Sequence, residues 1–183
     1  MATYFTSDTH FSAQRTLELS KRPFIDISDM DKTLISNWNK KVSKNDIVMH
    51  LGDFGNYEKI KELNGKVILI CGNYEFQDLK NLFQNDKDKF TEYLLLLGFH
   101  NVYYNPVIYN NKTTLKNIWL CHEPSKHNPE YFNLFGHIHR LCMVKKFGLN
   151  VGTDCHYFSP ISEEDILFQK NGIENHYDNE VFL

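Results

Sequence analysis

The sequence lacks the features that mark secreted and membrane proteins. Its first residues show no basic stretch followed by an apolar run and reach an acid at Asp8, so we expect no signal peptide. The longest apolar run, residues 93–99, is far shorter than the ~20 residues that cross a bilayer. The 4 cysteines include no C-x-x-C pair, which favours reduced thiols over a disulfide framework. We therefore expect a cytoplasmic protein with no membrane partner.

A strong charge of one sign is also missing. The 20 lysines and arginines against 23 acids leave a formal net charge of −3 with the 9 histidines neutral. The longest basic stretches are the pairs Lys40-Lys41 and Lys145-Lys146, which are too short to form a stripe for a long nucleic acid. Hydrophobic residues at 42% and charged residues at 23% are typical of globular chains and exclude disordered or collagen-like ones.

No linker, repeat or low-complexity tract divides the chain, so we expect one domain over residues 1–183. A helix is predicted over about residues 29–42 with Ser28 as its N-cap, because apolar residues recur there at four-residue steps. Residues 77–98 have a second helical pattern, and residues 105–121 indicate a hairpin about Asn110-Asn111. The predicted strands cover residues 4–6, 47–51, 67–71, 132–135 and 149–151. The pattern indicates a mixed α/β domain.

Five of the apolar runs end in side chains that can bind a metal ion. Active sites of α/β sheets gather at the carboxyl ends of strands, so we expect these side chains to meet. Two pairs are spaced i, i+2, and on an extended backbone both members of such a pair point to the same side and can reach one centre. Glycines precede three of the residues, as expected where the backbone must approach a bound group closely. The residues are Asp8 with His10, Asp53, Asn73, His122, and His137 with His139.

This donor set of two carboxylates, one amide and four imidazoles contains no thiolate. It suits manganese, the first choice, or iron, nickel or zinc, better than a structural zinc site. Seven ligands exceed the needs of one tetrahedral ion and suit two ions that share a carboxylate. Two ions ~3.5–4 Å apart clamp the oxygens of an in-line displacement at phosphorus. The sequence therefore predicts two divalent metal ions and phosphoester hydrolysis.

Taken in order, these residues resemble the sequence blocks of the calcineurin-like metallophosphoesterases, which are D-x-H, G-D, G-N-H-[DE], a later H, and G-H-x-H. Further stretches are similar to small bacterial and phage members, over roughly residues 3–168. The resemblance implies an α/β (α+β) fold in which two mixed β-sheets pack as a sandwich flanked by helices, in four layers. The matching blocks are Asp8-Thr9-His10, Gly52-Asp53, Gly72-Asn73-Tyr74-Glu75, His122 and Gly136-His137-Ile138-His139.

The resemblance also implies how the ligands divide between the metals. Asp53 would bridge the two ions, and a bridging hydroxide would attack phosphorus. Asn73, Tyr74 and His122 are the predicted catalytic residues. The implied ligands are Asp8, His10, Asp53 and His139 for one ion and Asp53, Asn73, His122 and His137 for the other.

Tyr74 departs from the family pattern, because most members carry a histidine at this position. That histidine is thought to contact the phosphate and protonate the leaving group, and tyrosine, with a reference pKa of about 10, is a weaker acid. Members with another residue here are often phosphodiesterases. We therefore expect a phosphodiesterase acting on a small or nucleotide-like phosphodiester. A Tyr74 that merely lines the pocket is an equal alternative.

Arg15 and Arg140 are candidates for contact with the substrate phosphate, although exposed arginines on loops are common. His50 is interpreted as a packed core histidine that supports a ligand. A nuclease is one alternative function, against which the missing basic stripe argues. A degenerate family member acting as a binding or scaffold module is another, against which the complete ligand set argues. The sequence leaves the natural substrate and the oligomeric state open.

Overall fold

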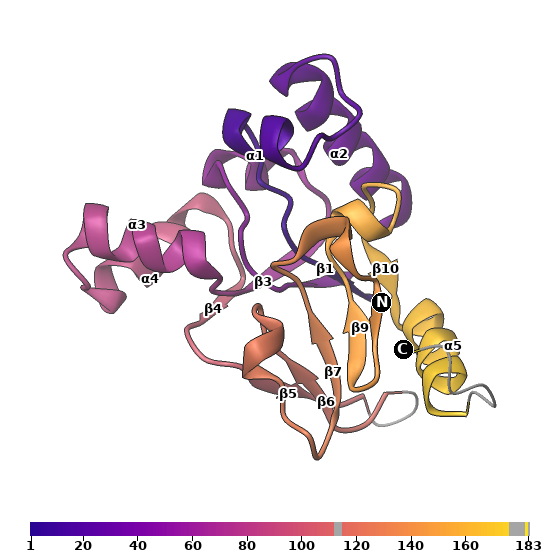
Figure 1. Cartoon of the computed structure of the whole chain (residues 1–183). Coiled ribbons are helices and arrows are strands. Elements are labelled where there is room, and N and C mark those ends of the chain that lie inside the picture. The colour runs from indigo at the N-terminus through magenta and orange to yellow at the C-terminus, as the bar shows by residue number, and fades with distance from the viewer. Residues whose placement is uncertain (112–114, 176–181, 183) are drawn as a thin grey trace.

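The computed structural model describes residues 1–111, 115–175 and 182, and contains two five-stranded sheets (Figure 1). The first sheet has the order β10-β1-β2-β3-β4, in which β1 to β4 are parallel and β10 pairs antiparallel with β1. The carboxyl ends of its parallel strands therefore lie at the same end of the sheet. The strands are β1 (Thr3–Thr6), β2 (Ile47–His50), β3 (Lys66–Ile70), β4 (Asn101–Tyr103) and β10 (Ile161–Ser162).

The second sheet has the order β5-β6-β7-β9-β8. Its three inner strands β6, β7 and β9 are parallel, and β5 and β8 pair antiparallel at the two edges. The predicted hairpin is confirmed as the β5 and β6 pair, although part of its connection, residues 112–114, lies outside the described residues. The strands are β5 (Val107–Tyr109), β6 (Ile118–Leu120), β7 (Phe132–Phe135), β8 (Val144–Lys145) and β9 (Gly148–Asn150).

Four helices, α1 to α4, cover the outer face of the first sheet, and α5 lies beside β9 and β10 (Figure 1). A 3₁₀-helix, η1 (Tyr57–Glu62), follows β2 and packs on α4. Across the described residues, none of the helices combines the length and apolar character needed to span a membrane. The helices are α1 (Gln14–Leu19), α2 (Ile27–Lys41), α3 (Asn73–Phe83), α4 (Lys87–Leu97) and α5 (Glu163–Glu174).

Two hydrophobic cores hold these layers together. The first lies between α1 to α4 and the first sheet, where Trp38 packs with Val67 and Leu69. The second lies between the two sheets, where Phe5 packs with Leu134. Strand β3 contributes to both cores, so it is covered on both faces. The predicted fold of two mixed sheets packed face to face with helices outside is also confirmed.

The ends of the long helices differ from the prediction. Helix α2 begins at Ile27, and its N-cap is Asp26, whose carboxylate accepts a 2.8 Å bond from the Asp29 N–H, so the prediction of Ser28 was wrong. The helical pattern over residues 77–98 is two helices. Gln84 and Asn85 adopt positive φ between them, a conformation that cannot continue a right-handed helix.

Candidate metal centre

The predicted ligands meet where the carboxyl ends of the two sheets come together. Strands β1, β2 and β3 of the first sheet and β6 and β7 of the second each run into one or two of them. The side chains form two groups, and inside each group the potential ligand atoms all lie within 4.8 Å of one another. We call these groups the first triad, which consists of Asp8, His10 and His139, and the second triad, which consists of Asp53, His122 and His137.

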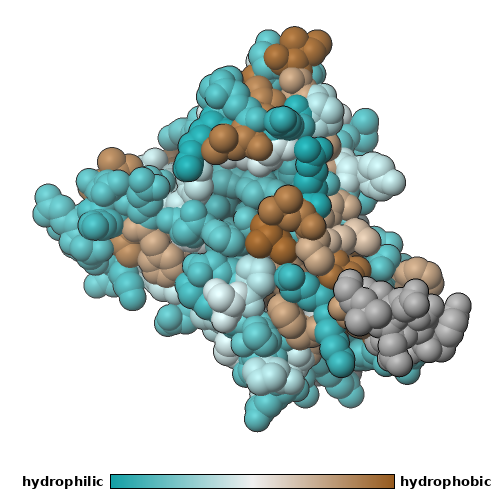
Figure 2. Space-filling view, viewed as in Figure 1, coloured by the Kyte–Doolittle hydropathy of each residue, from teal (hydrophilic) through white to brown (hydrophobic). Residues whose placement is uncertain are grey.

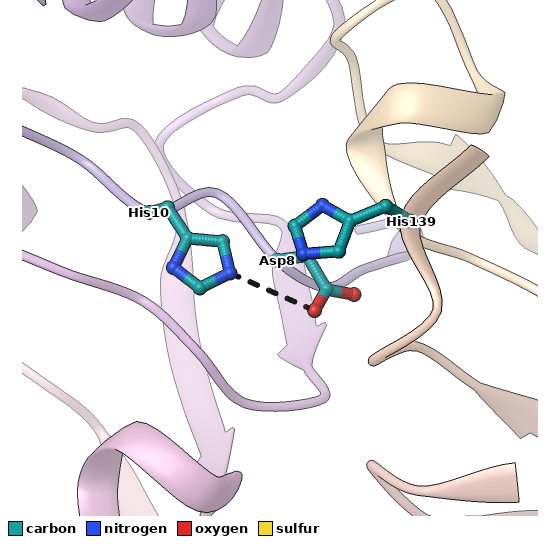
Figure 3. A group of neighbouring side chains, drawn as sticks. All are labelled: Asp8, His10 and His139. Atoms are coloured by element: carbon teal, nitrogen blue, oxygen red, sulfur yellow. Dashed lines mark ion pairs between the residues drawn. The ribbon is translucent and has the colours of Figure 1, made fainter. Parts of the chain in front are cut away.

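In the first triad, three side chains from two distant parts of the chain point toward one another (Figure 3). His10 Nε2 lies 3.9 Å from Asp8 Oδ1, and the rings of His10 and His139 stack with centroids 5.1 Å apart. Asp8 is held by the His137 N–H, which donates to its Oδ2 at 2.9 Å. A residue of the second triad therefore fixes the carboxylate of the first.

Asn73 joins the second triad. Its Oδ1 lies 2.9 Å from His122 Nε2 and 3.0 Å from His137 Nδ1. Asp53 of the second triad also reaches the first, because its Oδ1 is 3.4 Å from His122 Nε2 and its Oδ2 is 3.6 Å from His10 Nε2. All seven predicted ligands are thus brought together, with Asp53 in reach of both groups.

The backbone at the two i, i+2 pairs is not extended, contrary to the prediction. Asp8 and His10 have φ of 56° and 49°, and His137 and His139 have φ of 71° and 49°. The first pair still shares one triad, but His137 and His139 belong to different triads, so the expectation that both reach one centre was wrong for them. A left-handed φ at a non-glycine residue costs on the order of 1 kcal/mol, and residues with this conformation cluster at functional sites.

The three glycines of the motifs let loops from different strands touch. A Cβ on Gly52 would lie against the backbone N of Gly72, and a Cβ on Gly136 would overlap Ser7 Oγ and Asp8 Oδ2. The space these glycines provide is therefore filled by neighbouring loops of the site. This close approach is what brings ligands from separate strands together.

Glu75 holds two of these loops together, a role that the sequence motif alone does not predict. Its buried carboxylate accepts bonds from the N–H groups of Asp53 at 2.8 Å, Phe54 at 2.9 Å and Gly72 at 2.7 Å. Burial, and then the charge of Asp53, raise the pKa of Glu75 to about 7. Glu75 therefore orients the backbone that carries Asp53 and Asn73.

The sequence interpretation missed a buried ion pair behind the first triad. Arg22 Nη2 lies 2.7 Å from Asp154 Oδ2, and the same oxygen lies 3.1 Å from His139 Nδ1. Burial acts to raise the pKa of Asp154, but the bonds from His139 and Arg22 outweigh it and lower the pKa to about 2. Arg22 also donates to the Thr9 carbonyl at 2.8 Å. A carboxylate on Nδ1 fixes the ring and leaves Nε2 of His139 to bind a metal.

The chemistry of the donors fits divalent cations. His10 is only 1% exposed, and neither of its ring nitrogens has a hydrogen-bond partner among the described residues. Burial lowers its pKa to about 3, so the ring is neutral and offers a lone pair. An unpaired buried nitrogen costs about 1–3 kcal/mol, which coordination of a cation would offset.

The second triad favours positive charge at its centre. His122 donates from Nδ1 to the Leu51 carbonyl at 2.6 Å, which directs Nε2 toward Asp53 and Asn73. Burial acts to lower the pKa of His122, but the carboxylates of Asp53 and Asp8 outweigh it and raise the pKa to about 9. The same field that holds a proton here would hold a metal cation.

A cavity of about 300 Å³ opens over both triads. Tyr74 and Arg15 line it, with Arg15 Nη1 donating to Tyr74 Oη at 3.2 Å and the Tyr74 ring set edge-on to His10 at 4.8 Å. Arg140 lies outside this cavity and lines a neighbouring hollow. The predicted substrate roles of Arg15 and Arg140 stay predictions.

His50 lies beneath the site, in the core. Its Nε2 is 2.9 Å from Thr9 Oγ1, and its ring lies near that of Trp38. Thr9 in turn donates to the Phe54 carbonyl at 2.9 Å, so its hydroxyl accepts the bond from His50. His50 is thus a packed histidine that supports the segment between Asp8 and His10.

Comparisons with known proteins agree with this geometry. The model of the family described as the calcineurin-like phosphoesterase superfamily domain matches residues 1–160. The chain is 30% identical over 175 residues to the uncharacterized protein MJ1445 of Methanocaldococcus jannaschii, across 90% of this chain and 88% of that protein. The crystal structure of the protein of unknown function AQ665 from Aquifex aeolicus has a similar fold, with a TM-score of 0.67, 24% identity, and coverage of 90% of this chain and 97% of that one.

Proposed function

The chain belongs to the calcineurin-like phosphoesterase superfamily, and from this premise we propose that it is a metal-dependent phosphodiesterase for a small or nucleotide-like phosphodiester. The observation that carries the proposal is the convergence of the two triads on Asp53, which is in reach of both. This arrangement suits a binuclear centre whose ions share one carboxylate.

The seven ligands would hold two divalent cations, with manganese as the first choice. Asp8, His10 and His139 would hold one ion and His122, His137 and Asn73 the other, with Asp53 between them. When bound, the two cations supply a water of lowered pKa as nucleophile and offset the charge on the phosphoryl oxygens. Arg22 and Glu75 act only through the ligands, by fixing His139 and the loops of Asp53 and Asn73.

In this proposal Arg15 and Tyr74, which line the cavity, bind the phosphoryl group. The Tyr74 hydroxyl accepts its bond from Arg15, so its own proton is available to a substrate oxygen. Arg15 keeps further N–H donors for a second oxygen. A phenol is a weak acid at neutral pH, so this pair favours binding of a diester with a good leaving group over protonation of a poor one.

The size and charge of the site favour a small substrate. The cavity over the triads is at the lower end of the ~300–1,000 Å³ range of small-molecule sites. The net charge of −3 and the absence of a basic run in the sequence do not favour a long nucleic acid.

Hydrolysis of bis(p-nitrophenyl) phosphate tests the proposal. We expect Mn²⁺ to support release of p-nitrophenolate, a chelator to stop it, and added Mn²⁺ or Ni²⁺ to restore it. As a control, Lys44→Ala should keep the activity of the parent protein, because Lys44 is exposed and precedes β2 at the opposite end of the sheet. No turnover with any of Mn²⁺, Ni²⁺, Fe²⁺, Zn²⁺ and Mg²⁺ would overturn the proposal.

Tyr74 variants test the preference for diesters. Tyr74→His restores an acid of pKa near neutrality and should raise turnover of p-nitrophenyl phosphate, a monoester, by about 10²-fold, the lower end of general-acid effects. Tyr74→Phe removes the hydroxyl and should lower kcat/KM for the diester. If both variants leave the kinetics unchanged, Tyr74 only lines the pocket.

A further inference from the structure

A second hollow, of about 570 Å³, adjoins the cavity over the triads. It lies between the end of α1 and the segment that follows β7. Leu19, Ser20, His137 and His139 line both spaces, so a molecule bound at the triads can extend from one into the other. The remaining lining residues are Lys21, Ile138, Arg140 and Leu141.

The walls of this hollow expose large apolar side chains. Leu19 is 69% exposed and Leu141 is 85% exposed. Figure 2 shows brown patches over α1 and over the segment after β7, on two sides of the hydrophilic centre of this face. A single exposed leucine is ordinary, but two on opposite walls of a hollow that joins a polar site suit the flat or apolar body of a ligand.

The same hollow carries two cations. Lys21 and Arg140 line it, and neither side chain has an ion pair with a carboxylate among the described residues. Arg22, the next residue to Lys21, is by contrast buried and paired with Asp154. The hollow therefore offers positive charge to a second anionic group, next to the space over the triads.

We propose that this hollow binds one esterifying group of the substrate, and that this group combines an apolar or planar body with a second anionic charge, as a phosphorylated nucleoside does. The inference rests on the proposed function, because it places the scissile phosphorus at the triads. Leu19 and Leu141 would contact the body of the group, and Lys21 and Arg140 its remote phosphate. The substrate class is then a phosphodiester with a further phosphate on one of its two esterifying groups.

Two matched substrates test the inference: thymidine 5′-(p-nitrophenyl phosphate) with and without a 3′-phosphate. Both release p-nitrophenolate from the same phosphodiester, so they differ only in the remote charge. With Mn²⁺ we expect kcat/KM to be about tenfold higher with the 3′-phosphate, which equals about 1.4 kcal/mol. Arg140→Ala and Lys21→Ala should lower this ratio toward one, and Lys44→Ala should keep it.

Leu141 has its own test. Leu141→Asp puts a negative charge into the hollow, which would repel the 3′-phosphate of the substrate. It should therefore lower kcat/KM more for the 3′-phosphorylated substrate than for the other. Leu141→Met keeps an apolar side chain and should preserve the ratio of the two values. Equal loss in both variants for both substrates would contradict a role of Leu141 in the hollow.

Direct binding separates this inference from the proposed function. Calorimetry with the Mn²⁺-loaded protein should show tighter binding of thymidine 3′,5′-bisphosphate than of thymidine 5′-monophosphate, and Arg140→Ala should remove the difference. If the protein hydrolyses bis(p-nitrophenyl) phosphate but binds the two nucleotides equally, the proposed role of the hollow is overturned and the proposed function stands. If the two nucleotides bind differently but no diester is hydrolysed, the proposed role of the hollow is supported and the proposed function is overturned.

Discussion

The two ends of the first sheet differ in how completely their polar groups are paired. At the amino end, Asp46 accepts bonds from the N–H groups of Ala2 at 2.7 Å and Ser43 at 2.9 Å, and Trp38 donates to the Asn64 carbonyl at 2.8 Å. At the carboxyl end, both ring nitrogens of the buried His10 lack hydrogen-bond partners among the described residues. Backbone strain differs in the same direction, since five of the proposed ligands have φ between 49° and 71°.

The difference shows which part of the sheet serves stability and which serves chemistry. Real proteins depart from local structural preferences mainly at functional sites, and the rest of the fold supports the departure. Changes at the carboxyl end should therefore affect activity far more than stability, and changes near the amino end should do the reverse.

Asp53→Asn should have the largest effect. It removes the charge shared by the two triads, and we expect kcat/KM for bis(p-nitrophenyl) phosphate to fall by about 10³-fold or more, or about 4 kcal/mol. The charge of Asp53 repels Glu75 but attracts His122, so its removal relieves one interaction and loses another in the metal-free protein. Urea unfolding without metal should therefore show only a small change in stability. A large loss of stability would break the comparison.

Trp38→Ala tests the other region. Trp38 is buried in the first core, and its truncation should lower the free energy of unfolding by about 3–5 kcal/mol. The activity per folded molecule should stay near that of the parent protein, measured below the unfolding transition. Trp38→Phe, which keeps an aromatic ring but loses the bond to Asn64, should cost less. A loss of activity in Trp38→Phe without a loss of stability would contradict the assignment of stability to the amino end of the sheet and of activity to the carboxyl end.

His10→Leu should uncouple metal binding from folding. In a chelator its stability should equal or exceed that of the parent protein, because an unpaired buried nitrogen is removed. Mn²⁺ at about 100 times its Kd should stabilise the parent by about 2.7 kcal/mol, and His10→Leu should lose much of this gain. In His122→Leu the Leu51 carbonyl loses one of its two donors and keeps the Ser7 hydroxyl, so this variant should already be less stable by about 0.5–1.5 kcal/mol without metal. Equal behaviour of both variants in the chelator would remove the distinction.

Asp46→Asn should have the smallest effect, one that depends on pH. The bonds from the N–H groups of Ala2 and Ser43 hold the pKa of Asp46 below its ordinary value. A carboxyl with a lowered pKa in the folded state stabilises the protein above its unfolded pKa of about 3.9, and this contribution is lost as the pH falls through the folded pKa. The stability difference between parent and variant should therefore shrink on acidification from pH 6 to pH 3. A constant difference would show that Asp46 acts through packing alone.

Some elements could be predicted because a local pattern determines them. Strand β7 has the predicted bounds Phe132–Phe135, and the ligands meet at strand ends because parallel strands share an edge. The N-cap of α2 is a local feature that sequence reasoning assigned to the wrong residue, since Ser28 and Asp26 are both good caps.

Other features follow from contacts between distant residues. Arg22 and Asp154 are 132 residues apart, and no spacing rule pairs them. His137 and His139 lie in different triads, and both have left-handed φ, a conformation that the i, i+2 rule for extended chains does not cover. The division that the family resemblance implies matches the two triads, because a family pattern carries three-dimensional information that a single spacing lacks.

The metal content of the purified protein tests the central claim most directly. After dialysis against Mn²⁺ and removal of free metal, elemental analysis should find two ions per chain, and Asp53→Asn, which weakens both triads at once, should hold fewer. Lys44→Ala should match the parent protein. Fewer than one tightly bound ion per chain in the parent would contradict a binuclear centre and favour a family member that binds without catalysis.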